Sequence, residues 1–259
     1  MPMKDQLLKL VATVPNKLNV LREYLQSFIL FGLQKHKFFH QCVFLGGTCL
    51  RFVTDLPRFS EDLDFSLATG GLDSADIGRR LGQELEAAGY QTTVKEHPNK
   101  SVVALEISFS GLLFETHVSR DPRKKVMIKV EIDTCPPPGN STAVTLANKY
   151  FPLALKHNDL ETLLAGKINA LFTRPYTKGR DYFDIFWLLS RNRVSPNLPF
   201  LQNALRQMKS NIHAREWKAV LAEKIQNTSW KQIVSDVSPF LEFPGLEESF
   251  TPEVLLSLL

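Results

Sequence analysis

Cysteine is scarce in this sequence. The chain has three, Cys42, Cys49 and Cys135, among 259 residues. The number is odd, no pair forms a CxxC motif, and no histidine is spaced to complete a zinc site with them. We therefore expect reduced thiols in an intracellular protein. A chain of this length buries enough surface to fold without a disulfide or a structural metal.

Long apolar runs are also missing. No stretch approaches the roughly 18–20 apolar residues that a membrane-spanning helix needs. The first residues, Met1-Pro2-Met3-Lys4-Asp5, lack the basic start and apolar core of a signal peptide. The sequence predicts a soluble, cytoplasmic protein with no membrane partner.

An excess of charge of one sign is absent as well. Lys and Arg number 31 and Asp and Glu 27, a formal net charge of +4. This balance excludes a uniformly basic, histone-like or ribosomal-protein-like chain, although it leaves room for a local basic groove. The 44% of hydrophobic residues is typical of a globular fold rather than of a disordered chain.

The first half of the chain alternates helical and strand patterns. Apolar residues at spacings of three and four predict an amphipathic helix over 16–36. A helix over 73–89 should stop at Gly89, and Val126, Ile128, Val130 and Ile132 form one face of an alternating strand. Further elements are predicted for the short segments 40–45 (strand), 48–54 (helix), 63–67, 90–95, 102–109 and 112–118 (strands).

The second half has a helical character. The run Cys135-Pro-Pro-Pro-Gly-Asn140 breaks regular structure and is the best internal boundary. Helical patterns follow over 160–172, 181–191, 200–209 and 214–226. We predict an α/β domain with a mixed sheet over residues 1–139 and a helical domain over 140–259.

Two acidic residues mark the first candidate site. Asp62 and Asp64 lie two positions apart on a predicted strand, so their side chains leave the same face. Neighbouring carboxylates raise each other's pKa unless a cation lies between them, and carboxylate oxygens suit Mg²⁺. The triplet alone is weak evidence, because a solvated acidic turn has the same pattern.

A glycine turn lies before the acidic pair. Gly46 and Gly47 end a buried strand and begin a helix, where backbone amides attract anions, and Thr48 adds a hydroxyl. Neither the P-loop pattern nor GxGxxG is present. A phosphate-binding turn followed after about fifteen residues by a carboxylate pair is the minimum that metal-assisted nucleotidyl transfer requires.

Four motifs in order resemble those of the AbiEii/AbiGii toxin family, a nucleotidyltransferase-like group of abortive-infection and toxin–antitoxin systems. The resemblance covers roughly residues 15–195. Its motifs are Arg22-Glu-Tyr-Leu-Gln26 with Phe44-Leu-Gly-Gly-Thr48 and Leu50-Arg51, then Arg58-Phe-Ser-Glu-Asp-Leu-Asp-Phe65, Lys167-Ile-Asn-Ala-Leu-Phe-Thr-Arg174, and Gly179-Arg-Asp-Tyr-Phe-Asp184.

The resemblance implies an α+β fold of the DNA polymerase β-like nucleotidyltransferase superfamily. It would have a mixed β-sheet core, N-terminal helices and a C-terminal helical domain that contributes the Lys and RDxxD motifs. In such folds a third carboxylate on a later strand completes the metal site. Glu131 and Asp133 are the candidates, and we favour Glu131 because it lies within its strand rather than at its end.

The later motifs imply further site residues. Lys167 and Arg174 are seven residues apart, which is two helical turns, so we expect them on one face of one helix. The resemblance makes Lys167, and less strongly Arg174, a contact of the β- or γ-phosphate. Asp181 would act as a base or orient Lys167, although it could equally cap its helix, and Asp184 is expected to be structural. Either Arg51, after the glycine turn, or Arg58, at the start of the acidic motif, would neutralise the triphosphate.

These observations predict a toxin-type, Mg²⁺-dependent nucleotidyltransferase with an NTP as substrate. Asp62, Asp64 and Glu131 would hold one or two Mg²⁺ ions. The acceptor would be an RNA, such as a tRNA 3′ end, or a protein hydroxyl, and a cognate antitoxin is an expected partner. The alternatives are a catalytically silent nucleotide- or RNA-binding regulatory module, and phosphoryl transfer from the same site. The filled carboxylate positions favour an enzyme over the silent module.

Overall fold

The computed structural model describes residues 3–99, 101–191 and 193–259. Its chain divides into two compact units. The sheet unit comprises Met1–Val53, Phe59–Pro136 and Val144–His157, and the helical unit comprises Thr54–Arg58, Pro137–Ala143 and Asn158–Leu259. No helix in the described ranges is long and apolar enough to cross a membrane.

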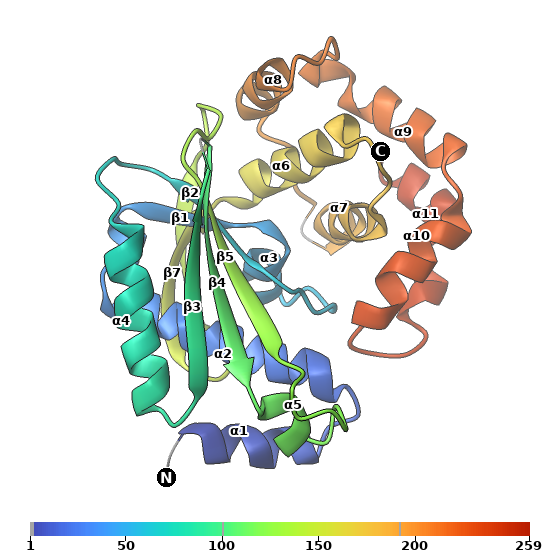
Figure 1. Ribbon diagram of the computed structural model, residues 1–259. Coiled ribbons are helices and arrows are strands. Elements are labelled where there is room, and N and C mark those ends of the chain that lie inside the picture. Colours follow the sequence, from blue (N-terminus) through green and yellow to red (C-terminus); the bar gives the residue numbers. More distant parts are fainter. Residues whose placement is uncertain (1–2, 100, 192) are drawn as a thin grey trace. The chain divides into compact units, whose positions relative to one another are not determined.

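Within the described residues, seven strands form one mixed sheet in the order β3-β4-β5-β2-β1-β7-β6 (Figure 1). β2 is antiparallel to β1 and parallel to β5, β1 is parallel to β7, and β4 is antiparallel to β3 and β5. The strands are β1 (Cys42–Leu45), β2 (Leu63–Leu67), β3 (Gln91–Pro98), β4 (Val102–Ser110), β5 (Val126–Asp133), β6 (Thr142–Asn148) and β7 (Pro152–Asn158).

Along the sequence, the helices of the sheet unit precede these strands or connect them. They are α1 (Met3–Ala12), α2 (Lys17–Lys35), α3 (Gly46–Val53), α4 (Ser74–Ala87) and α5 (Leu112–Glu115). The Asp73 carboxylate accepts a 2.9 Å hydrogen bond from the Asp76 amide and caps α4 at its start. Gly89 adopts a left-handed φ of 93° just beyond its end, so the predicted stop is confirmed.

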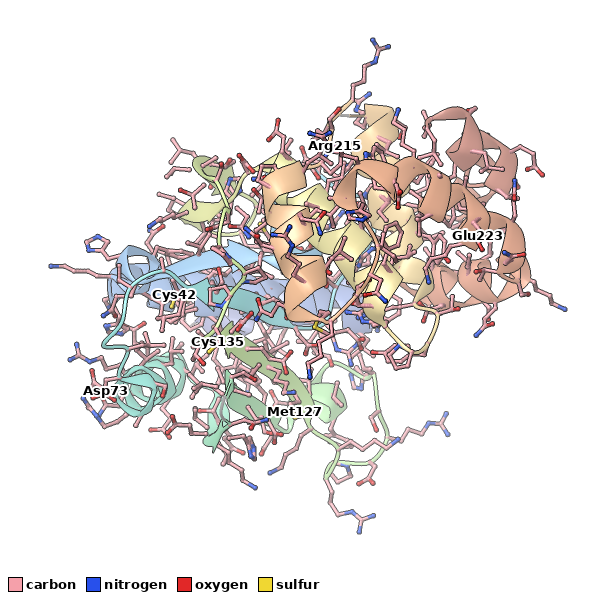
Figure 2. The ribbon with its side chains drawn as sticks, turned by 90° about the horizontal axis from the view of Figure 1, so that it is seen from above. Cys42, Asp73, Met127, Cys135, Arg215 and Glu223 are labelled. Carbon is pink, nitrogen blue, oxygen red and sulfur yellow. The ribbon has the colours of Figure 1, made fainter. Side chains whose placement is uncertain are left out.

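The alternation predicted for β5 is confirmed. Val126, Ile128, Val130 and Ile132 are buried. Met127, labelled in Figure 2, is 48% exposed on the opposite face. One face of this strand therefore belongs to the core, and the other carries Met127 and the polar residues.

Helix α4 identifies which face of the sheet is the apolar one. A Cβ on Gly78 of α4 would lie 3.4 Å from the side chain of Leu105, and Leu105 is the β4 partner of Val130. Val130 in turn pairs with Leu63 of β2. Because successive strand residues point to opposite faces, Asp64 projects from the face that α4 does not cover.

The prediction of a strand over 112–118 is wrong. This segment contains the short helix α5 instead. Gly111 takes a φ of 78°, which ends β4 and turns the chain. The Thr116 hydroxyl then donates a 2.6 Å hydrogen bond to the Leu112 carbonyl, which satisfies a backbone group of the turn. Local hydrogen bonds therefore favour a helical turn in this segment, although its composition is typical of a strand.

The helical unit follows the predicted helical patterns. Its helices are α6 (Leu160–Thr173), α7 (Gly179–Arg191), α8 (Leu198–Gln207), α9 (Trp217–Asn227), α10 (Trp230–Val237) and α11 (Pro252–Ser257). The Asp159 carboxylate caps α6 by accepting a 2.9 Å bond from the Thr162 amide. The structure adds β6, β7, α1, α10 and α11, none of which the sequence patterns predicted.

Candidate active site

The predicted glycine turn joins β1 to α3. Gly46 is the first residue of α3 and takes a φ of 83°. A Cβ at Gly46 would lie 2.2 Å from the Oδ2 atom of Asp64. Only glycine leaves the Asp64 carboxylate room to lie against this turn, so the glycine turn and the acidic motif meet as predicted.

Asp64 is next to a second carboxylate across the sheet. Asp64 and Glu131 are register partners on the parallel strands β2 and β5. Register partners project from the same face, and adjacent strands lie about 4.8 Å apart. Asp64 also pairs with Leu45, the last residue of β1. Three neighbouring strands thus place the turn and two carboxylates in one region of the sheet.

Contacts of the two candidates for the third carboxylate differ. The Asp133 Oδ1 atom accepts a 2.8 Å hydrogen bond from the Cys135 amide, so this carboxylate stabilises the turn after β5. Its register partner, Ser66, is buried. Glu131, beside Asp64, has no such turn to support, which favours it over Asp133 as a metal ligand.

Glu131 has a cationic neighbour two residues earlier on the same face of β5. The Lys129 ammonium lies 2.5 Å from the Glu131 Oε1 atom. This hydrogen bond raises the pKa of Lys129, against a smaller effect of desolvation, and the charges of Glu131, Asp62 and Glu106 raise it further. Lys129 therefore supplies positive charge beside the acidic residues.

Asp62 precedes β2, and its backbone is bound to the glycine turn. The Thr48 hydroxyl donates a hydrogen bond to the Asp62 carbonyl oxygen, and the Thr48 side chain is fully buried. This contact fixes the acidic motif to the first turn of α3. Within the described residues, however, the structure shows no group of three or more His, Cys, Asp or Glu side chains already arranged to hold a metal ion.

Arg51 lies in the interior of the sheet unit. Its Nε atom donates a 2.6 Å bond to Glu23, and its guanidinium lies 4.9 Å from the centre of the Phe59 ring. Glu23 also accepts from Lys149 at 3.1 Å and from the Tyr150 hydroxyl at 2.9 Å. Arg51 is 3% exposed, so these contacts assign it to a buried ion-pair cluster.

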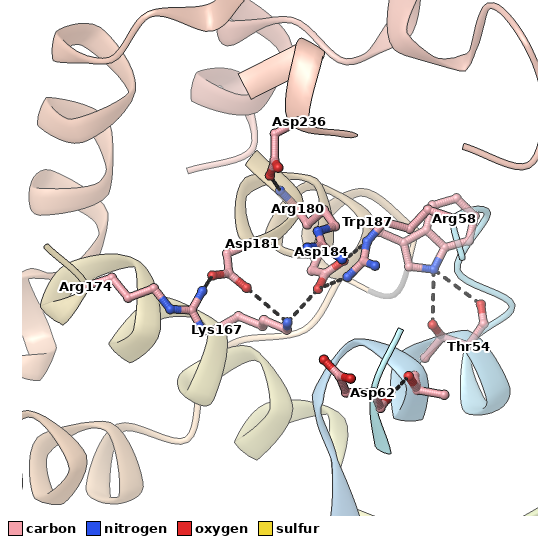
Figure 3. A network of polar contacts seen from close by, with 11 residues as sticks. Thr54, Arg58, Asp62, Lys167, Arg174, Arg180, Asp181, Asp184, Trp187 and Asp236 are labelled. Atoms are coloured by element: carbon pink, nitrogen blue, oxygen red, sulfur yellow. Dashed lines mark hydrogen bonds and ion pairs between the residues drawn. The ribbon is translucent and has the colours of Figure 1, made fainter. Parts of the chain in front are cut away.

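The Lys and RDxxD motifs meet within the helical unit (Figure 3). The Lys167 ammonium lies 3.0 Å from Asp181 Oδ1 and 2.7 Å from Asp184 Oδ2. Asp181 also binds the Arg174 guanidinium. Burial on its own would lower the pKa of Lys167, but attraction by Asp184 and Asp181 outweighs it and raises the pKa. Lys167 is thus held as a fixed cation.

Arg174 reaches Asp181 from just outside the predicted helix. Helix α6 ends at Thr173, and Arg174 is extended, with ψ of 138°. The next residue is Pro175, which disfavours a helical conformation in the residue before it. Lys167 and Arg174 therefore both bind the Asp181 carboxylate, although only Lys167 lies within α6.

Arg58 completes this set of charges. Its Nε and Nη2 atoms donate to the two Asp184 oxygens at 2.7 and 2.6 Å. Both side chains are almost fully buried, at 2% and 0% exposure. Burial favours the neutral acid, but Arg58 and Lys167 outweigh it and lower the pKa of Asp184. This position supports the structural role predicted for Asp184 and assigns Arg58 the same role.

Glycine also permits a close helix contact at the RDxxD motif. A Cβ on Gly179 would lie 2.3 Å from the Ile233 carbonyl oxygen of α10. The Asp236 carboxylate of the same helix accepts a 3.2 Å bond from the Arg180 amide. The start of α7, which carries Asp181, is therefore held in place by α10.

Comparisons with known proteins agree with this architecture. No curated protein matches the chain. The crystal structure of JHP933 from Helicobacter pylori is similar, with a TM-score of 0.51 at 20% identity, over 93% of this chain and 88% of that one. A candidate nucleotidyltransferase from H. pylori gives a TM-score of 0.53 at 21% identity, over 92% of this chain and 89% of that one. These two likenesses concern the fold alone, and the second matches it to a nucleotidyltransferase fold.

A family comparison goes further than the fold. The model of the nucleotidyl transferase AbiEii toxin family, of type IV toxin–antitoxin systems, matches residues 29–251. This range includes the glycine turn, the acidic motif, Lys167 and Asp181. The match confirms the resemblance from residue 29 onward, whereas the motif segment 22–26 lies outside the matched range. The chain belongs to the AbiEii nucleotidyltransferase toxin family.

Proposed function

We propose that this protein transfers a nucleoside monophosphate from an NTP to an acceptor hydroxyl in a Mg²⁺-dependent reaction. One observation carries the proposal: the Asp64 carboxylate lies directly against Gly46, where a side chain would collide with it. A turn that offers backbone amides to phosphate thus adjoins a carboxylate that suits a divalent cation. Family membership supports the same class of reaction.

The residues present fit Mg²⁺. It takes oxygen ligands, usually one or two carboxylates together with water and phosphate oxygens. Asp62, Asp64 and Glu131 supply such oxygens, and the space left by Gly46 admits the Asp64 carboxylate. When bound, Mg²⁺ would polarise the α-phosphate and lower the pKa of the attacking hydroxyl. Lys129 pairs with the Oε1 atom of Glu131, so the Oε2 oxygen of this carboxylate would take part.

The phosphates would be bound by backbone and by fixed cations. We propose that the amides of Gly46, Gly47 and Thr48, in the first turn of α3, bind the β- and γ-phosphates. The Thr48 hydroxyl already donates to the Asp62 carbonyl and is not needed for this role. Lys167 would contact a phosphate oxygen, with Asp181 orienting it through their 3.0 Å ion pair.

The two arginines predicted at the phosphates differ in their support. Arg51 is committed to Glu23 inside the sheet unit, and the proposal does not require it. Arg174 binds Asp181 with one nitrogen and is 30% exposed, so other N–H groups of its guanidinium can bind an anion. Catalysis would rest on positioning and charge neutralisation.

The acceptor is proposed to be an RNA, such as a tRNA 3′ end, or a protein hydroxyl. Membership of a family from type IV toxin–antitoxin systems implies a cognate antitoxin. The proposed transfer also implies pyrophosphate as the second product, because the bond that breaks lies between the α- and β-phosphates.

Label transfer tests this proposal. The protein is incubated with each NTP, labelled at the α- or the γ-phosphate, with Mg²⁺, total RNA and lysate protein. We expect α-label on an acceptor and its loss in Asp64→Asn, while the matched variant Asp133→Asn keeps most activity. Transfer of γ-label alone would indicate phosphoryl transfer instead. Binding of NTP without any transfer, alike in wild type and Asp64→Asn, would indicate a silent binding module.

A further inference from the structure

A small polar cavity lies wholly within the helical unit. Its volume is about 180 Å³, and it is lined by the end of α6, residues 175–178, the start of α7 and the end of α9. Pockets for ligands of nucleotide size usually measure about 300–1,000 Å³. This cavity is too small for a whole nucleotide, but a phosphate group with a few waters fits.

Cations dominate the wall of this cavity. Arg174, Lys178 and Lys224 line it together with one carboxylate, that of Asp181. Three cations against one anion give the lining a formal charge of +2. Asp181 is moreover already bound by Lys167 and Arg174.

Lys178 and Lys224 have their donors available. Both are partly buried, and within residues 3–99, 101–191 and 193–259 neither ammonium group forms an ion pair or a hydrogen bond. A partly buried ammonium without an acceptor is unfavourable, because the desolvation of its charge is not compensated. Two such groups on one polar cavity point to an anion as the missing partner.

The hydroxyl groups of Thr228 and Tyr182 beside the cavity bind protein groups, so the lysines are the better donors to an anion. The Thr228 hydroxyl donates a 2.6 Å bond to the Lys224 carbonyl and lies 3.2 Å from the Tyr182 hydroxyl. These groups satisfy one another and form a fixed wall. Thr177 adds an exposed hydroxyl at the rim.

Electrostatics at Lys178 agree with this picture. Desolvation lowers the pKa of Lys178, and the charges of Arg180, Lys167 and Arg174 lower it further, while Asp181 opposes them. An anion in the cavity would reverse this effect, because an opposite charge nearby favours the protonated amine. Anion binding should therefore raise the pKa of Lys178.

We propose that this cavity binds one phosphate group of a substrate, with Lys178 and Lys224 as its principal donors and Arg174 as the third. The phosphate belongs either to the tail of the NTP or to the backbone of an RNA acceptor. This assignment of the source rests on the proposed function, whereas the phosphate site itself does not.

Binding measurements without turnover test the proposal. The protein is titrated in EDTA with inorganic pyrophosphate, with each NTP, and with a single-stranded RNA oligonucleotide over a range of salt concentrations. Lys178→Gln and Lys224→Gln are compared with Lys231→Gln, which removes the same charge from an exposed position on α10. Thermal unfolding of each variant confirms that it is folded.

The expected result is roughly a tenfold loss of affinity for a phosphate-bearing ligand in both cavity variants, because charge-assisted hydrogen bonds are lost, and less than a twofold loss in Lys231→Gln. If the RNA is the source, the slope of log K against log salt should also fall by about 0.7. A loss for NTP and pyrophosphate alone assigns the cavity to the NTP tail. Unchanged affinity for all three ligands would overturn the proposal.

These outcomes are independent of the transfer assay. Nucleotidyl transfer with cavity variants that bind like wild type would leave the proposed function standing and remove the cavity site. Phosphate binding that depends on Lys178 and Lys224, in a protein that transfers no label, would do the reverse.

Discussion

Replacing Gly46 with alanine should disable the acidic site through one methyl group. The substitution places a Cβ at a φ of 83°, and that Cβ would lie 2.2 Å from Asp64 Oδ2. The left-handed conformation costs about 1–2 kcal/mol for a residue with a side chain. An ordinary contact needs at least 3.4 Å, so the Asp64 carboxylate must also move by roughly 1 Å.

Both effects can be measured separately. Gly71 has a φ of 91° and nothing within 4 Å of its Cβ position, so Gly71→Ala carries the conformational cost without the collision. We expect both variants to lose about 1–2 kcal/mol of unfolding free energy in urea titrations. Only Gly46→Ala should also lose about 100-fold in label transfer, since displacement of a catalytic group by 1 Å can cost that much.

Two results would refute this reasoning. If Gly46→Ala retained wild-type transfer, the position of Asp64 against the turn would have no catalytic meaning. If Gly71→Ala lost as much activity as Gly46→Ala, the loss would come from general destabilisation rather than from the collision with Asp64.

Three further predictions concern other parts of the chain. Glu131→Gln should weaken Mg²⁺ binding, measured calorimetrically with a non-hydrolysable NTP analogue, about tenfold more than Asp133→Asn; equal effects would contradict the choice of Glu131. Asp184→Asn removes the charged carboxylate that the buried Arg58 and Lys167 share, and should cost about 3–5 kcal/mol of unfolding free energy at pH 7. Because the pKa of Asp184 is lowered in the folded protein, its carboxylate stabilises the fold at pH values above the unfolded-state pKa of about 3.9. This stabilisation is lost as pH falls through the folded-state pKa. The free energy of unfolding of Asp184→Asn should therefore decrease less steeply with falling pH than that of the wild type. Gly179→Ala should lower the melting temperature by several degrees because its Cβ would lie 2.3 Å from a backbone oxygen, whereas Gly166→Ala, with nothing within 4 Å, should leave it unchanged or raise it.

Local patterns predicted the elements whose burial they reflect directly. The alternation over 126–132 indicated β5 correctly because one face of that strand is buried and the other is not. The edge strand β6 was not predicted, because its apolar residues Val144 and Leu146 are 67% and 83% exposed and do not form a buried face. In α5, Leu112 and Leu113 are buried in a turn set by Gly111, and composition alone does not distinguish this from a strand.

Motif reasoning located the candidate residues but not all of their partners. The spacing of Asp62 and Asp64 and the glycine turn predicted a meeting that the structure shows. Arg58 and Asp184 are 126 residues apart, and no local pattern links them. Arg51 lies beside the glycine turn in sequence, yet it is buried, because residues 47–52 of α3 are buried on every side of the helix.

The contact between Gly46 and Asp64 has an evolutionary consequence. Each residue restricts the other: a side chain at position 46 excludes the carboxylate, and the carboxylate excludes the side chain. Among relatives, a residue larger than glycine at position 46 should therefore occur together with a residue smaller than aspartate at position 64. Such pairs would mark lineages that have given up the metal site while keeping the fold, and sequence comparison could detect them without a single assay.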